Sequence, residues 1–203
     1  MILVVDYGMG NLRSVSKALE HLGASVKVSS EPRDIECADK LVLPGVGAFG
    51  DAVSELKKLR LDDAIRSFLK RERPFLGICL GLQLLFHESE EAPGIFGFDF
   101  FRGKVRRFFD ATVKIPHMGW NSIQIDRPHR LLAGVPDGSF FYFVHSFYAS
   151  PDCEDGIVAR CRYGADLFSA IVGSGTVFAT QFHPEKSQAA GLKILKNFTE
   201  WNP

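Results

Sequence analysis

Cysteine and excess charge are both scarce in this sequence. Its 203 residues hold four cysteines, none in a CxxC pair, and the chain is longer than the small, cysteine-dense proteins that need disulfides. The 24 basic and 24 acidic side chains give a formal net charge of zero. A balanced charge gives no reason to expect a nucleic-acid or anionic-membrane partner. We therefore expect reduced thiols and a small-molecule or protein partner.

Long apolar runs are also missing. None approaches the ~20 residues that cross a bilayer, and the start, MILVVDYGMGN, has no basic segment before its apolar residues. We expect no membrane span, no signal or transit peptide and a cytoplasmic location. Repeats, low-complexity tracts and linkers are absent too, so we expect a single domain over residues 1–203.

Strands and helices alternate in the first half of the chain. Hydrophobic periodicity predicts strands at 2–6, 25–28, 40–43 and 75–78, and helices at 12–21, 51–59, 61–70 and from 80 through 86. Such alternation favours an α/β fold of three layers, with a mostly parallel central sheet covered by helices on both faces. After Pro93 the pattern changes to short strands, within 139–150, 156–163 and 174–185, and a last helix near 190–201. We expect these to be antiparallel or mixed strands added to the same sheet.

The segment YGMGNLR, residues 7–13, partly matches the dinucleotide fingerprint GxGxxG. Arg13 stands where the third glycine belongs, and no acidic residue ends the second strand to bind a ribose. A dinucleotide site is therefore disfavoured, and we expect no cofactor.

One cysteine stands between two glycines in RPFLGICLGLQLLF, residues 73–86. A free cysteine is most often a small core residue. Here, however, Cys79 lies where the predicted strand meets the predicted helix, and Gly77 and Gly81 remove the side chains that would collide in a sharp turn. Such a turn projects the sulfur into a cleft, where N–H groups at the helix start favour thiolate and bind an oxyanion.

A thiolate that attacks an amide needs a base, and His183 in TQFHPEKS is the best candidate. It follows an apolar strand, and Pro184 keeps the chain extended, so Glu185 lies on the same side and can fix the imidazole tautomer. An ordinary surface pair is the alternative. The other histidines considered as bases have polar neighbours, and we expect them to be solvated: His21, His87 and His129. No further His or Cys stands at ligand spacing, so we expect no metal.

The loop PGVG, residues 44–47, follows the strand that precedes the cysteine strand by one crossover. We expect its backbone to pass beside Cys79 at the carboxyl edge of the sheet. A glycine-rich backbone there can lend an N–H to an oxyanion, together with the N–H of Leu80. By itself the loop is equally consistent with an ordinary turn.

In this order, PGVG, GICLGLQ and FHPEKS resemble the class I (triad-type) glutamine amidotransferases over essentially the whole chain. The resemblance implies a flavodoxin-like fold in which Cys79 forms a thioester with glutamine, while His183, oriented by Glu185, moves protons and releases ammonia. It implies that Gln83 and neighbouring backbone bind glutamine and its oxyanion; the assigned positions are Gly45, Val46, Gly47, Leu80, Gln83, His145, Ser146 and Phe147.

The segments DYGMGNLRSV, PHMGWN, FYFVHSFY and HPEKS resemble one branch of this family closely. In that branch the ammonia passes to a separate cyclase subunit with a (β/α)₈ barrel, in a heterodimer. The resemblance assigns the docking face to Asn11, Met118, Trp120, Asn121, Tyr142 and Lys186. Three alternatives stay open: a glutaminase of another synthase, such as pyridoxal phosphate synthase; a related cysteine hydrolase or chaperone; and a non-catalytic binding module.

Overall fold

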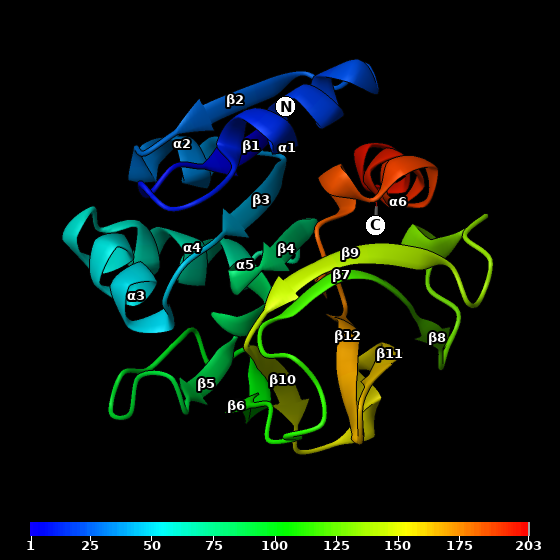
Figure 1. Ribbon diagram of the computed structural model, residues 1–203. Helices are drawn as coiled ribbons and strands as arrows, with labels where there is room; N and C mark the ends of the chain where they lie inside the picture. The colour runs from blue at the N-terminus through cyan, green and yellow to red at the C-terminus, as the bar shows by residue number, and fades with distance from the viewer. Residues whose placement is uncertain (203) are drawn as a thin grey trace.

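An eight-stranded sheet forms the centre of the molecule in a computed structural model that describes residues 1–202 (Figure 1). In spatial order its strands are β2 (Val26–Ser29), β1 (Ile2–Val5), β3 (Lys40–Gly45), β4 (Phe75–Cys79), β13 (Val177–Thr180), β12 (Asp166–Ser174), β11 (Ile157–Tyr163) and β8 (Gln124–Ile125). The first five are parallel, and the last three add antiparallel pairs. The predicted α/β class with a mostly parallel sheet is confirmed.

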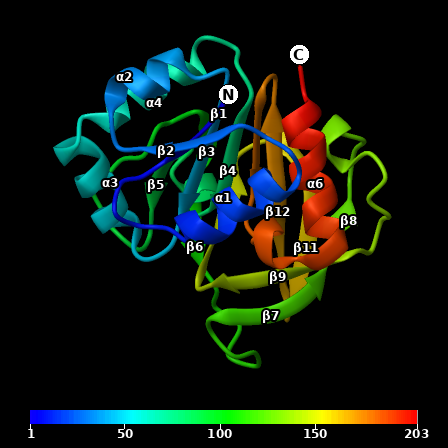
Figure 2. The same ribbon diagram turned by 90° about the horizontal axis from the view of Figure 1, so that it is seen from above.

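Helices cover both faces of this sheet (Figure 2). One face packs against α1 (Leu12–His21) and α6 (Gln188–Glu200), and the other against α2 (Pro32–Cys37), α3 (Phe49–Lys58) and α4 (Leu61–Leu69). Successive residues of a strand point to opposite faces, so Ile2 and Val4 enter the first core and Leu3 and Val5 the second. Every residue of β1 is consequently buried.

Most predicted elements lie within one or two residues of their observed bounds, and α1 has the bounds that the sequence predicts. Its buried residues Val15 and Leu19 face the sheet, and Gly23 follows it with φ +82°. The short helix α2 was not predicted. It has six residues and a single buried hydrophobic side chain, Ile35, so it has too few apolar positions to show a helical period.

The helix predicted from Leu80 through Phe86 is wrong in length. The helix α5 spans only Leu80–Gln83, and the chain then turns into strand β5 (Phe86–Ser89). The carbonyl of Leu84 accepts an N–H from Phe98 at 2.7 Å, and that of Leu85 accepts one from Phe100 at 2.8 Å. Backbone bonds to a distant segment therefore replace the next helical turn, and His87 is an exposed residue of strand β5 rather than part of a helix.

The expectation that the later strands all join the central sheet is also wrong. A second sheet consists of β10 (Phe147–Pro151), β6 (Phe101–Arg107) and β5. A third is the antiparallel pair β7 (His117–Ser122) and β9 (Phe140–His145), here called the ribbon. The run 139–150, within which the sequence predicts a short strand, holds two strands that meet at Ser146, where the chain passes from the ribbon to the second sheet. This break brings residues 145–147 to the edge where β4 ends.

Three short 3₁₀ helices complete the described chain: η1 (Arg130–Leu132), η2 (Glu154–Gly156) and η3 (Pro184–Lys186). Within residues 1–202 we find no helix with the length and apolar character that a membrane crossing requires.

Candidate active site

Cys79 ends strand β4 at the carboxyl edge of the central sheet, and α5 begins at the next residue. Its backbone is strained, with φ 55° and ψ −107°, a conformation that a non-glycine residue rarely adopts. The flanking glycines are sterically required. A Cβ at Gly77 would lie 2.8 Å from the carbonyl oxygen of Gly81, and one at Gly81 would collide with the carbonyl of Leu43. The predicted sharp turn is therefore present.

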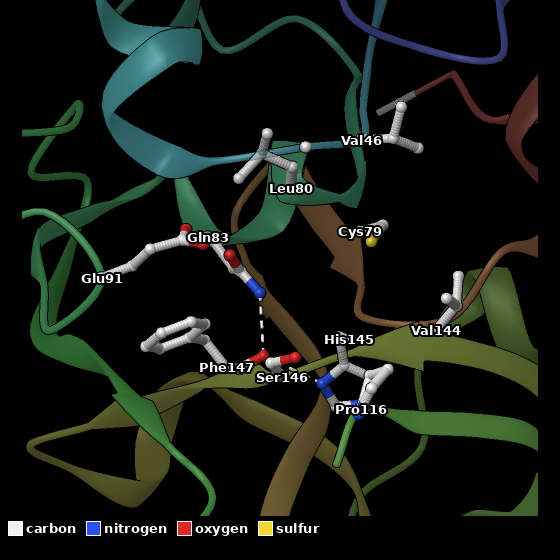
Figure 3. A pocket seen from close by; sticks show the side chains of 11 residues that line it. Val46, Cys79, Leu80, Gln83, Glu91, Pro116, Val144, His145, Ser146 and Phe147 are labelled. Carbon is white, nitrogen blue, oxygen red and sulfur yellow. Dashed lines mark hydrogen bonds between the residues drawn. The ribbon is translucent and has the colours of Figure 1, made fainter.

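The Cys79 side chain faces a cavity of about 340 Å³ (Figure 3). The cavity is lined by Val46, Gly47, Cys79, Leu80, Gln83, Glu91, Pro116, Val144, His145, Ser146 and Phe147. Of the predicted substrate positions only Gly45 is missing from this lining. Gly45 belongs to strand β3, where it pairs with Cys79, and a side chain there would collide with the hydroxyl of Tyr7.

Three residues of the lining were missed from the sequence: Glu91, Pro116 and Val144. Glu91 is the one carboxylate among the lining residues, and its Oε2 accepts the backbone N–H of Phe49 at 2.8 Å. In the sequence it belongs to an acidic segment, ESEE, of a kind that is typical of solvated surface. Only the contact with α3 places it on the cavity.

His183 and Glu185 form a buried pair behind Cys79. His183 Nδ1 lies 2.9 Å from Glu185 Oε1, and both side chains are 1% exposed, so an ordinary surface pair is excluded. Burial lowers the pKa of His183, but hydrogen bonding to Cys79 and Glu185 and their negative charge raise it more, to about 10. His183 Nε2 has no hydrogen-bond partner of normal geometry, although the sulfur is close enough to act on its pKa. The arrangement favours the imidazolium form of His183 beside the sulfur.

Gln83 is held by its nitrogen. Its Nε2 donates to the carbonyl oxygen of Phe147 at 2.9 Å and to Oε1 of Gln181 at 3.2 Å (Figure 3 shows the first bond). Both amide hydrogens are therefore used within the protein, which leaves Oε1 as the atom that can accept a hydrogen bond from a ligand.

Two further histidines lie in the same region. His145 Nδ1 is 2.9 Å from the carbonyl oxygen of Phe147, and its Nε2 is 3.1 Å from Nδ1 of His117. Burial lowers the pKa of His145 to about 3 and that of His117 to about 4, so both are neutral at neutral pH. Neither serves as the charged partner of the thiolate.

The histidines expected to be solvated differ in their environment. His21 and His87 are exposed, but His129 is half-buried. Its Nδ1 accepts the N–H of Leu131 at 3.2 Å, and burial together with Arg127 and Arg130 lowers its pKa to about 4. The expectation for His129 is wrong because the loop folds back onto Phe178 and Trp201.

Of the residues that the resemblance assigns to docking, Met118, Trp120 and Tyr142 lie on the outer side of the ribbon. Met118 and Trp120 are 63% and 46% exposed, and Trp120 pairs in register with Tyr142. The Nζ atom of Lys186 lies 5.9 Å from the centre of the Tyr142 ring. Asn11 is half-buried at the start of helix α1, which packs on η3. Asn121 lies on the opposite face of the ribbon, because its amide donates to the carbonyl of Arg162 at 2.9 Å. Phe140, 59% exposed, lies on the ribbon as well and was missed.

The described residues, 1–202, hold no cluster of His, Cys, Asp and Glu that suits a metal ion. Cys79 as nucleophile, His183 with its orienting carboxylate Glu185, and the cavity of about 340 Å³ beside them suit acyl transfer from an amide.

The fold and this site define a class I glutamine amidotransferase, and the chain belongs to that family, whose model "Glutamine amidotransferase class-I" matches residues 3–201. Within the family it belongs with the HisH subunits. It is 50% identical over 200 residues to "Imidazole glycerol phosphate synthase subunit HisH" of Methanosarcina barkeri, covering 98% of each chain. It is 46% identical over 201 residues to the protein of that name in Chlorobaculum tepidum, covering 99% of this chain and 100% of the relative.

Solved structures agree with the fold. The chain superposes on a structure described as "Crystal structure of glutamine amidotransferase" with a TM-score of 0.75 at 18% identity, covering 99% of this chain and 100% of the other. It also superposes on a chain of PurLQS from Thermotoga maritima, with a TM-score of 0.75 at 19% identity, covering 98% of this chain and 97% of the other.

Proposed function

We propose that this chain is the glutaminase subunit of imidazole glycerol phosphate synthase in histidine biosynthesis. It hydrolyses L-glutamine to glutamate and ammonia through a thioester on Cys79, and a cyclase subunit consumes the ammonia to form imidazole glycerol phosphate and an aminoimidazole carboxamide ribotide. The observation that carries the proposal is the buried Cys79, His183 and Glu185 beside a cavity of a size that suits one small ligand.

In the first half of the reaction the Cys79 thiolate attacks the side-chain carbonyl carbon of glutamine. The carbonyl oxygen becomes an oxyanion, which the N–H of Leu80 and an N–H of the loop at Val46 or Gly47 stabilise. His183 gives its Nε2 proton to the leaving nitrogen, the C–N bond breaks, and ammonia and the thioester remain. Glu185 accepts a hydrogen bond from Nδ1–H and so keeps the imidazole in one orientation.

In the second half a water molecule attacks the thioester carbon while neutral His183 Nε2 takes its proton. The C–S bond then breaks, the sulfur leaves as a thiolate, and glutamate is released. The imidazolium and thiolate are thereby restored, so the triad returns to its starting state without any cofactor.

The amino group of glutamine needs a binding site of opposite charge, and we assign it to Glu91 together with Oε1 of Gln83. Glu91 is the carboxylate on the cavity wall, and the N–H of Phe49 fixes its other oxygen. Gln83 has only its oxygen free for a ligand. The two oxygens suit an ammonium group, which donates hydrogen bonds and carries the compensating charge.

The Glu91→Gln variant should have a KM for glutamine raised about 10- to 100-fold, with kcat changed little, because a charged hydrogen bond to the substrate is lost away from the reacting carbon. Steady-state ammonia release measures both constants. Glu90→Gln is the matched control: Glu90 binds the N–H of Arg107 and Lys104 and lies outside the cavity lining. An unchanged KM in Glu91→Gln would remove this residue from the substrate site.

The cyclase partner, a (β/α)₈ barrel, docks in this proposal on the outer face of the ribbon. Met118 and Trp120 give that face exposed apolar surface, and Tyr142 with Lys186 borders it. The opposite face of the same ribbon carries His117 and His145, and the latter lines the cavity. Docking here brings the partner close to the place where ammonia forms.

The loop beside the cavity offers a way for the partner to control the reaction. Gly45 is fixed in β3, so only Gly47, with φ +99°, keeps the conformational freedom of glycine there. Rotation of the Val46–Gly47 peptide can turn its N–H into or out of the oxyanion site. One oxyanion donor typically changes kcat by about 10²–10³-fold.

Ammonia release from glutamine should therefore be slow for the isolated chain and about 10²–10³-fold faster with the ligand-bound cyclase. Trp120→Ala should weaken binding to the cyclase, in a pull-down, without changing turnover of the isolated chain. Binding to the pyridoxal phosphate synthase subunit instead of the cyclase would overturn the assignment of the partner. Equal turnover with and without the cyclase would overturn the control by the loop.

A further inference from the structure

Gln181 is fully buried and lies between two residues of the site. It follows strand β13 and precedes His183 by two positions. Its Oε1 accepts a hydrogen bond from Gln83 Nε2 at 3.2 Å, and its Nε2 donates to the sulfur of Cys79 at 3.8 Å. Its backbone N–H is fixed to the carbonyl of Ala170 at 2.8 Å. Gln181 thus joins the substrate-binding side chain to the nucleophile.

The orientation of the Gln181 amide follows from its neighbours. The backbone oxygen of Phe147 can only accept, so the nitrogen of Gln83 must face it. The second hydrogen on that nitrogen points to Gln181, which must therefore present its oxygen there. The nitrogen of Gln181 is left to face the sulfur, and it is a donor to Cys79 rather than an acceptor.

The same order of donors and acceptors continues away from Cys79. His145 Nδ1 also donates to Phe147 O, so His145 Nε2 accepts from His117 Nδ1, 3.1 Å away. His117 Nε2 then accepts from Asn121 Nδ2 at 3.2 Å, and the other hydrogen of that nitrogen goes to Arg162 O. This series of hydrogen bonds ends at both sides on a backbone carbonyl, of Phe147 and of Arg162. Only one choice of histidine tautomers and of the Asn121 amide orientation therefore satisfies every bond. Both histidines are neutral, as that assignment requires.

We propose that Gln181 is a positioning residue for the nucleophile, which donates an N–H to the Cys79 thiolate and is itself oriented by Gln83, whose amide is fixed by the carbonyl of Phe147. A donor on the sulfur stabilises the thiolate over the thiol and limits its rotation about χ1. The role of Cys79 as nucleophile rests on the proposed function, whereas the hydrogen bond from Gln181 to its sulfur is independent of that function.

Gln181→Met tests the inference, because methionine has the same length but no N–H donor and no buried charge. Alkylation of Cys79 by iodoacetamide at neutral pH should fall about tenfold, since the reagent reacts with the thiolate. Peptide mass analysis separates Cys79 from the exposed Cys37 and Cys153.

In Gln181→Glu the ionised carboxylate keeps the acceptor for Gln83 but repels the sulfur, so kcat should fall about tenfold while KM stays within about twofold. Gln181→Met should also raise KM.

Thr180→Val is the matched control. Thr180 precedes Gln181 and is equally buried, and its hydroxyl donates to Phe182 O at 2.9 Å rather than to Cys79. It should lower the melting temperature while leaving alkylation at the natural rate. A natural alkylation rate in Gln181→Met together with a natural kcat in Gln181→Glu would overturn the inference, even if Cys79→Ala abolishes ammonia release. Unchanged ammonia release by Cys79→Ala would instead overturn the proposed function.

Discussion

The Cys79→Ala variant should release ammonia from L-glutamine about 10⁴-fold more slowly than the natural chain, or slower still. The sulfur is the only atom on the cavity wall that the proposed reaction uses as a nucleophile, and the thioester cannot form without it. Ammonia release, measured with the ligand-bound cyclase present, gives the rate. Binding to the cyclase should be unaffected, because Cys79 is 6% exposed and lies behind the ribbon rather than on its outer face.

Cys161→Ala is the control for this result. Cys161 is also buried, in strand β11, and burial raises the pKa of its thiol to about 12, so it stays protonated and inert. Its loss should lower the free energy of unfolding and leave kcat unchanged. Full ammonia release by Cys79→Ala would refute the thioester mechanism.

The His183→Gln variant should have a kcat lowered about 10³- to 10⁴-fold, with a small change in KM, because the group that protonates the leaving nitrogen in the proposed reaction is lost. In Glu185→Gln the imidazole remains, but the negative charge that helps to raise its pKa is lost, so kcat should fall less far. Single-turnover ammonia release measures both variants. The exposed His21→Gln serves as control and should behave as the natural chain.

A His183→Gln variant with natural kcat would show that another group takes the proton. His145 lines the cavity and is the alternative, but its pKa is lowered to about 3 and both its ring nitrogens are engaged, with Phe147 and His117. A pH profile that moved to the acidic range in this variant would identify it.

The sequence predicts the strand-to-helix turn at Cys79 and the His183–Glu185 pair because both depend on neighbouring residues. Gly77 and Gly81 act within one turn of the cysteine, so the sharp turn follows from residues beside it. The His183–Glu185 pair is present, but the extended chain predicted for it is wrong: Pro184 begins the 3₁₀ helix η3, and only His183 before it is extended. The structure brings the two segments together because β4 and β13 are adjacent parallel strands.

Other parts of the site depend on contacts between distant segments and could not be predicted. Glu91 reaches the cavity through the N–H of Phe49, 42 residues earlier. The end of α5 is set by bonds from Phe98 and Phe100, and the break at Ser146 by the pairing of two separate sheets. Gln181 gave no signal, because a glutamine in a buried strand end has no periodic or motif pattern that separates it from an ordinary polar residue.

Covalent labelling tests the role of Cys79 most directly. A glutamine analogue that carries an electrophilic carbon in place of its amide is incubated with the chain and the cyclase, and the labelled peptides are identified by mass. We predict a single adduct, on Cys79, whose formation is slowed by excess L-glutamine and nearly abolished in His183→Gln. An adduct on another residue, or labelling of Cys79 that glutamine does not slow, would contradict a glutamine site built around this nucleophile.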